Sequence, residues 1–355
     1  MQRGLIDAES IVAGDVSITD ASRRHRNFIV RWQDGHGYFT KQATDHERSN
    51  ALRREALAYE ILNSTEPTSR SSLTCVPRLW DYDQERSVLV VELVPDAEDL
   101  RTAFVRRRRF SSRVARLVGR ALAILHALPT ERWRRTGGPL LSGPHWVLSI
   151  HEPHVALLRD ISAANISLIR TIQASEALVV ELSKLRDSWL STSLIHQDLR
   201  WDNVIVATKT ATYTSDVRII DWEAVALGDP AWDVASVLAD YLALWVQSIP
   251  LQGETTLEEM VALSQYPLAK MHPAMASFWS AYLEYMAPMT RTSEFVWRVV
   301  RYVAARLIQT AVEQLQSSAD LTGSGPALLQ LSINVLQRPQ EAAFHLLCVP
   351  TKVNA

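Results

Sequence analysis

The chain has 355 residues, of which 47% are hydrophobic and 21% are charged, and its formal net charge is −2. Such a composition is typical of a globular protein with one large domain or two, and the small net charge excludes a general nucleic-acid binder, which needs a clear basic excess. No apolar run approaches a membrane span, and the first residues lack the apolar core of a signal peptide. We therefore expect a cytoplasmic protein without membrane or nucleic-acid partners.

The first hundred residues favour strands. Alternating apolar residues, with glycine-containing turn chemistry between the second and third runs, predict a short antiparallel meander. One helix is predicted over Arg48–Leu62, and a serine- and threonine-rich loop follows at residues 63–74. The predicted strands are Ile11–Ile18, Phe28–Trp32, Tyr38–Lys41 and Ser87–Val94.

After residue 95 the apolar period becomes helical. A helix near Val114–Leu125 carries Arg113, Arg116 and Arg120 on one face, just after the basic run Arg106–Arg109. This basic face indicates either a strip for an acidic partner or a solvated helix surface. Further helical patterns cover Leu157–Trp189, a helix capped by Asp229 and opened by Pro230, Pro273–Tyr285, Ser293–Leu315 and Pro326–Cys348.

Two short apolar strands within residues 194–233 carry the chemistry. Asp198 is followed five residues later by Asn203, and Asp221 comes directly after the β-branched run Val217–Ile220. If the two strands pair as a hairpin, Asp198, Asn203 and Asp221 come together. His196 is interpreted as a buried histidine that holds the loop rather than as a metal ligand.

These residue types suit phosphoryl transfer from ATP to a hydroxyl group. The reaction needs magnesium to neutralise charge and an acceptor oxygen held in line. Hard cations take oxygen ligands, which carboxylate and amide side chains provide. Asn203 and Asp221 are therefore predicted metal ligands, and Asp198 is the predicted proton acceptor.

The segment resembles the aminoglycoside phosphotransferase and choline kinase family. That resemblance implies an α+β, two-lobed, protein-kinase-like fold with a small β-rich lobe at 1–95, a hinge near 92–97, and a larger α-rich lobe at 96–355. It also implies ATP and Mg²⁺ as cofactors, with Asp198 catalytic and Asn203, Asp221 and Glu223 as candidate metal ligands. The matching motifs are His196-Gln-Asp198 with Asn203, Ile220-Asp221-Trp222-Glu223, and Gly228-Asp229-Pro230 with Asp233.

Two letters depart from the usual family pattern. Gln197 stands where glycine is common, and Arg200 lies two residues after the predicted base. Protein kinases place a lysine at this second position that reaches the transferring phosphate, so Arg200 is predicted to supply a cation there.

The resemblance also implies which residues bind the nucleotide. Lys41, at the end of a strand, is expected to lie in an exposed cleft and bridge phosphates, paired with Glu55; Glu47 and Glu60 are weaker candidates. Glu92, Leu93 and Val94 are expected to hold the purine through their backbone. The connection at 20–27 contains Arg23, Arg24 and Arg26 but no glycine, which disfavours a tight phosphate cradle.

The predicted function is ATP- and Mg-dependent O-phosphorylation. A catalytically inactive kinase-like binding protein is one alternative, and an unrelated ATPase is disfavoured because G-x-x-x-x-G-K-[ST] is absent. The basic strip favours a Ser or Thr of a precursor peptide with an acidic leader, as in lanthipeptide-type pathways. A small-molecule acceptor such as an aminoglycoside, a choline-like alcohol or a sugar is the alternative.

Overall fold

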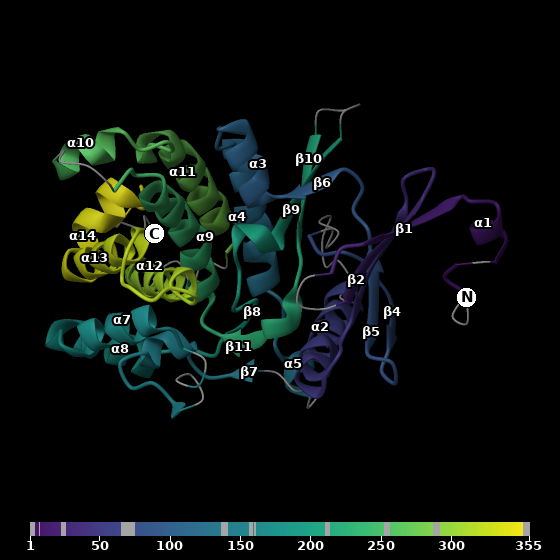
Figure 1. The fold of residues 1–355 in the computed structure, drawn as a ribbon, viewed down its shortest axis with the longest axis horizontal. Helices are drawn as coiled ribbons and strands as arrows, with labels where there is room; N and C mark the ends of the chain where they lie inside the picture. The colour runs from purple at the N-terminus through teal and green to yellow at the C-terminus, as the bar shows by residue number, and fades with distance from the viewer. Residues whose placement is uncertain are drawn as a thin grey trace. The chain divides into compact units, whose positions relative to one another are not determined.

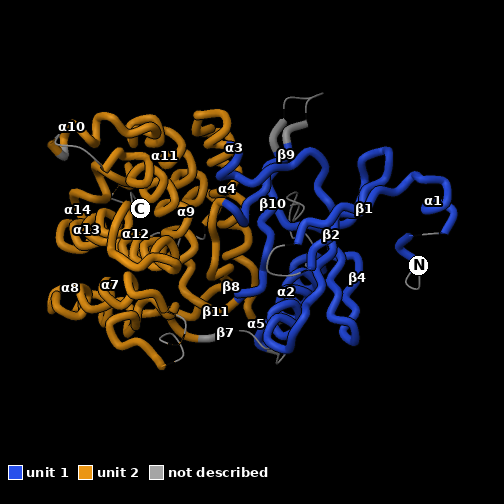
Figure 2. Tube along the Cα trace, viewed as in Figure 1, with its two compact units in different colours: residues 1–103, 131–141, 202–225 blue, residues 104–130, 142–201, 226–355 orange. Residues whose placement is uncertain are grey.

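The computed structural model describes residues 4–6, 8–22, 26–64, 75–135, 141–155, 159, 161–209, 214–251, 256–286 and 292–350. The chain forms two compact units (Figure 2). Unit 1 comprises residues 1–103, 131–141 and 202–225, and unit 2 comprises residues 104–130, 142–201 and 226–355. These units are not the same division as the expected lobes, so the lobe boundary at residue 95 stays a prediction.

A five-stranded sheet of order β1-β2-β3-β5-β4 forms the main part of unit 1, with all neighbours antiparallel. Helix α2 lies beside this sheet (Figure 1) and buries Leu52, Ala56 and Tyr59. The predicted meander and helix are confirmed. The bounds are β1 Val16–Asp20, β2 Arg26–Trp32, β3 Gly37–Gln42, α2 His46–Ser64, β4 Leu79–Asp83 and β5 Val88–Glu92.

The first predicted strand, Ile11–Ile18, is confirmed from Val16 onward and is wrong in its first part. A short helix, α1 Ala8–Val12, precedes β1, and Gly14 adopts φ +76° in the turn between them. Only glycine adopts such a φ without steric cost, so the chain changes direction inside the apolar run. Residues 23–25 of the basic connection and residues 65–74 of the expected loop lie outside the described residues.

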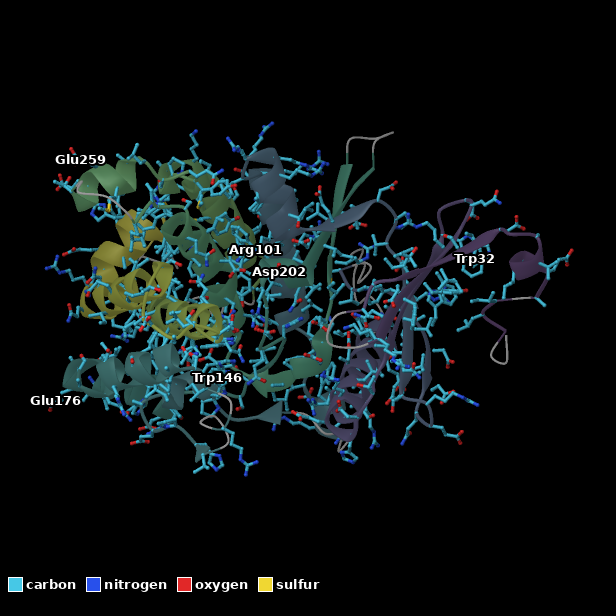
Figure 3. All side chains as sticks on the ribbon, viewed as in Figure 1. Trp32, Arg101, Trp146, Glu176, Asp202 and Glu259 are labelled. Carbon is cyan, nitrogen blue, oxygen red and sulfur yellow. The ribbon has the colours of Figure 1, made fainter. Side chains whose placement is uncertain are left out.

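A second sheet in unit 1 has the order β10-β9-β6. Its strands are β6 Ala97–Asp99, β9 Val204–Lys209 and β10 Thr214–Ile219, and the turn η3 Trp222–Ala224 follows β10. Arg101 Nε lies 3.3 Å from Asp202 Oδ2 beside this sheet (Figure 3). Unit 1 also contains α5 Glu131–Arg135.

Unit 2 is mainly helical, and its core is made by α4 on α11 and by α12 between α9 and α13. At Gly119 of α4, a Cβ atom would collide with the carbonyl oxygen of Phe278, so glycine permits the close approach of α11. The bounds are α4 Ser112–His126, η1 Trp146–Ser149, α7 Ala163–Gln173, α8 Glu176–Asp187, β8 Ser193–Ile195, β11 Ala226–Gly228, α9 Pro230–Gln247, α10 Leu257–Ala262, α11 Leu268–Tyr285, α12 Ser293–Gln314 and α13 Ser324–Gln337.

Among the described elements, those that contain a unit boundary are α3 Leu100–Arg107, β7 Leu141–Ser142 and η2 Trp201–Asn203. The last predicted helix, Pro326–Cys348, is wrong in its second half. It breaks after Gln337, because Pro339 has no N–H to donate; the short α14 Pro339–Glu341 and η5 Ala342–Leu346 follow. None of the helices in the described ranges has the length and apolar character that a bilayer crossing requires.

Candidate active site

Lys41 is the centre of a charge cluster in unit 1. Its Nζ donates to both carboxylate oxygens of Glu55, each at 2.9 Å, and to Asp221 Oδ1 at 2.5 Å. Strand β3 supplies the lysine, α2 supplies Glu55, and Asp221 follows β10. The predicted Lys41–Glu55 ion pair is therefore confirmed.

Burial of this cluster corrects one expectation. Lys41 is 9% exposed and Glu55 is 1% exposed, so Lys41 is not the open cleft residue expected from the sequence. Burial alone lowers the pKa of Lys41, but the carboxylates of Glu55 and Asp221 outweigh it and hold that pKa above its usual value. Burial raises the pKa of Glu55 to about 7, and the Lys41 charge limits the rise. The lysine therefore stays protonated at neutral pH.

Asn203 and Asp221 are neighbours across the paired strands. Strands β9 and β10 are antiparallel with Val204 opposite Ile219, and the N–H of Ile220 donates to the Asn203 carbonyl at 2.9 Å. The expected pairing is confirmed for β9 and β10 only, because the segment before Asp198 forms a separate strand, β8, that pairs with β11. Asp221 adopts φ +67°, a left-handed conformation that is uncommon for a non-glycine residue and typical of functional positions.

The donor set at this end of the strands fits magnesium. Magnesium is usually held by one or two protein carboxylates together with waters and substrate phosphates. Asp221 and Asn203 offer oxygens of that kind, although the described residues contain no group of three or more His, Cys, Asp or Glu that could hold a metal ion. Glu223, the third predicted ligand, lies in η3, and its backbone carbonyl accepts from Arg54 Nε at 2.9 Å. The metal roles stay predictions.

Asp198 belongs to unit 2, on the loop between β8 and η2. Since Asn203 and Asp221 belong to unit 1, the expected grouping of the three side chains stays a prediction. The backbone N–H groups of His196 and Gln197 donate to the two oxygens of Asp233, at 2.6 and 3.0 Å. His196 is fully buried, as expected.

A second aspartate holds the other end of the same loop. The N–H of Trp201 donates to Asp240 Oδ2 at 2.7 Å. Asp233 and Asp240 are seven residues apart on α9, which is about two helical turns, so they share one face of the helix. Helix α9 therefore fixes the backbone on both sides of Asp198.

Gln197 adopts φ +68°, which explains why glycine is the usual residue at this place in the pattern. Two hydrogen bonds hold the strained backbone: its N–H donates to Asp233, and its carbonyl accepts from Trp232 Nε1 at 2.8 Å. A left-handed non-glycine residue costs roughly 1–2 kcal/mol, so these contacts maintain the loop against its local preference.

Arg200 binds carboxylates through all three guanidinium nitrogens. Its Nε donates to Asp198 Oδ1 at 2.9 Å, and its two terminal nitrogens donate to the oxygens of Glu313 at 2.8 and 2.7 Å. Burial lowers the pKa of Arg200, but Asp198 and Glu313 outweigh it and raise that pKa. The structure thus places Arg200 beside Asp198; its predicted role at a phosphate stays a prediction.

The predicted purine-binding residues lie at the end of β5. The N–H of Glu92 donates to the Arg78 carbonyl at 2.8 Å, and the N–H of Leu93 donates to the Gly37 carbonyl at 3.0 Å. Two of the three predicted amide donors are therefore used inside the sheet. Of the three, Val94 is left as the candidate amide for a base, and this role also stays a prediction.

Sequence reasoning missed Asp240, Glu313, Gln309 and Arg306 as neighbours of the Asp198 loop. Asp240 left a signal, because it interrupts the otherwise apolar centre of α9. Arg306, Gln309 and Glu313 of α12 gave no such signal, because polar residues are ordinary on the surface of an amphipathic helix.

Comparison with known proteins identifies the family of this chain. A family model described as a phosphotransferase enzyme family matches residues 19–257. Among solved structures, the GDP and kanamycin complex of APH(2")-IIia is 15% identical, covers 91% of this chain and 93% of its own, and has a TM-score of 0.52. A choline/ethanolamine kinase family protein from Mesorhizobium loti is 13% identical, covers 96% and 95%, and has a TM-score of 0.50. No curated protein matches the chain. The predicted α+β, protein-kinase-like fold is confirmed.

Proposed function

Because the chain belongs to the phosphotransferase enzyme family, we propose that it transfers the γ-phosphate of ATP, with magnesium, to an acceptor hydroxyl group. Family membership makes the chain a kinase with a hydroxyl acceptor; the donor, the metal and the acceptor are the proposed parts. The observation that carries the proposal is the buried Lys41 ammonium held between Glu55 and Asp221.

Unit 1 supports the nucleotide half of this proposal. Glu55 holds the Lys41 ammonium in place, and the compact positive charge of a lysine suits phosphate oxygens. Asp221 and Asn203 would hold magnesium, with Glu223 as a further candidate. Magnesium, when bound, supplies the charge neutralisation that phosphoryl transfer needs.

Unit 2 supports the acceptor half. The Asp198 carboxylate accepts or orients the proton of the attacking hydroxyl group, which leaves the hydroxyl oxygen directed at the phosphorus. Asp233 and Asp240 hold the loop backbone around Asp198. A base whose backbone is held at both ends loses little freedom when the acceptor binds.

Measurement of magnesium-dependent ATP turnover with the purified protein tests the proposal. Asp221→Ala should abolish turnover, whereas Asp216→Ala, on the same pair of strands and in an ion pair with Arg218, should leave it near the wild-type value. Nucleotide binding without any turnover in the wild type would favour the inactive binding protein instead.

For the acceptor we propose a small-molecule hydroxyl compound. Two of the similar solved structures are a kanamycin complex and a choline/ethanolamine kinase family protein. In unit 2, the Arg116 guanidinium lies 2.5 Å from Glu284, and Arg120 lies over the Tyr285 ring at 4.9 Å. Two of the three arginines on this helix face therefore contact α11, and Glu284 offsets the positive charge of Arg116.

A Ser or Thr of a precursor peptide with an acidic leader is the second candidate acceptor. It is favoured by the exposed side chains of Arg106–Arg109 and Arg113. Replacing Arg113, Arg116 and Arg120 by Gln should then weaken an acidic peptide acceptor steeply as salt rises, because exposed charges are screened over about 10 Å at 0.1 M salt. Normal transfer to such a peptide by the triple variant at low substrate concentration would remove this candidate's support.

A further inference from the structure

One face of α12 carries three polar residues that lead to the Asp198 carboxylate. Arg306, Gln309 and Glu313 lie at positions i, i+3 and i+7, so their side chains follow one another along the helix. Gln309 Nε2 donates to Glu313 Oε1 at 2.8 Å, and an Arg306 terminal nitrogen donates to Gln309 Oε1 at 2.5 Å. Together with Arg200 and Asp198 they form a closed polar network within unit 2, in which the neutral amide of Gln309 links Arg306 to Glu313.

Arg306 is the residue that links α12 back to Asp198. It is only 2% exposed, its terminal nitrogen lies 4.0 Å from Asp198 Oδ1, and its guanidinium carbon lies 5.6 Å from the centre of the Trp232 ring. A buried guanidinium is costly unless a carboxylate compensates its charge. Asp198 therefore has one guanidinium at hydrogen-bond distance and a second one slightly farther away.

The Glu313 fork fixes the orientation of Arg200. The Arg200 side chain is 34% exposed and that of Glu313 is 31% exposed, so both are only partly in contact with solvent. Their bidentate geometry defines where the Arg200 guanidinium lies, because two parallel hydrogen bonds fix its plane. The remaining Nε is then directed at Asp198.

We propose that Glu313 is a positioning residue for the transfer reaction: supported by Gln309 and Arg306, it holds Arg200 so that Arg200 fixes the Asp198 carboxylate. The inference rests on the proposed role of Asp198 as proton acceptor. It replaces the idea of Arg200 as a phosphate ligand with that of a link between α12 and the base. The acceptor hydroxyl then meets a carboxylate oxygen whose direction is set before binding.

Steady-state kinetics of three single variants, one double variant and a control test this inference. Glu313→Gln removes the charge but keeps the shape, and kcat should fall by roughly 10- to 100-fold, since a misplacement of about 1 Å can cost 100-fold. The KM for ATP should stay within about twofold, because unit 1 supplies the nucleotide contacts proposed above. Glu313→Asp retains the charge and should give an intermediate kcat. Arg200→Lys retains charge without the fork and should fall as far as Glu313→Gln.

The double variant Arg200→Lys/Glu313→Gln decides whether the two residues act as one unit. Its kcat should equal that of Arg200→Lys alone, because coupled residues are non-additive. As a control, Glu341→Gln removes a carboxylate from an exposed pair with Arg338 at 3.6 Å on a neighbouring part of unit 2, and it should leave kcat unchanged.

An unchanged kcat in Glu313→Gln overturns the inference, and so do fully additive losses, which would mean that Glu313 acts on something other than Arg200. These failures are distinct from failure of the proposed function. If only the inference fails, Asp198→Asn is inactive while Glu313→Gln is active. If the proposed function fails, the wild type lacks ATP-dependent transfer or Asp198→Asn keeps it.

Discussion

Replacing Lys41 by Met should destabilise the protein as well as inactivate it. The substitution keeps the length of the side chain but leaves the buried Glu55 carboxylate and the Asp221 carboxylate without the ammonium between them. Removing one partner of a buried pair costs about 3–5 kcal/mol. The Asp221 side chain is 35% exposed, so solvent screens part of the repulsion and we expect about 3 kcal/mol, at the lower end of that range.

The loss should depend on pH, and its sign follows from Glu55. Burial and the Asp221 charge raise the pKa of Glu55, whereas Lys41 lowers it, so without Lys41 that pKa rises further above its wild-type value of about 7. A carboxyl whose folded pKa exceeds its unfolded value, here 4.5, contributes stability below the unfolded pKa and loses it as pH rises through the folded pKa. The variant should therefore be closest to the wild type near pH 5 and farthest from it at pH 8.

Urea unfolding of both proteins at pH 5 and pH 8 measures this difference. Lys184→Met is the matched control, because Lys184 makes an exposed ion pair with Glu181 at 2.7 Å, and it should change the free energy of unfolding by less than about 1 kcal/mol. A loss below about 1 kcal/mol at pH 8 for Lys41→Met, or the same loss at both pH values, would refute the reasoning.

Three further outcomes are expected. Asp198→Asn should lower phosphoryl transfer by roughly two to four orders of magnitude with little change in nucleotide affinity. Single-turnover transfer and nucleotide titration measure the two quantities. A large loss of ATP binding with transfer intact would reverse the assignment. Gln197→Gly should raise stability by about 1 kcal/mol because it relieves the left-handed backbone, and a lower melting temperature would show that the glutamine side chain contributes more than the strain costs. Asp240→Ala should cost about 1–3 kcal/mol because the buried N–H of Trp201 loses its partner, and an unchanged urea midpoint would contradict that.

The sequence by itself determined the features that depend on local pattern. The meander, α2, α9 and α12 followed from apolar period and capping residues, because neighbours along the chain decide those preferences. The three motifs indicated the family, and the two apolar runs were expected to pair, as β9 and β10 do. Lys41–Glu55 could be predicted because the family resemblance supplied the long-range partner that the local pattern does not reveal.

Only the tertiary structure decided how the Asp198 loop is held. Asp240 and Glu313 lie 42 and 115 residues after Asp198 in the chain. Asp240 is conspicuous as a charge in an apolar helix, but neither segment indicates which loop its carboxylate meets. The same holds for the burial of Lys41, which depends on the packing of α2 and on a carboxylate 180 residues away. Spacing along a chain reports which residues share one element, whereas burial and charge pairing arise only when distant elements pack and exclude water.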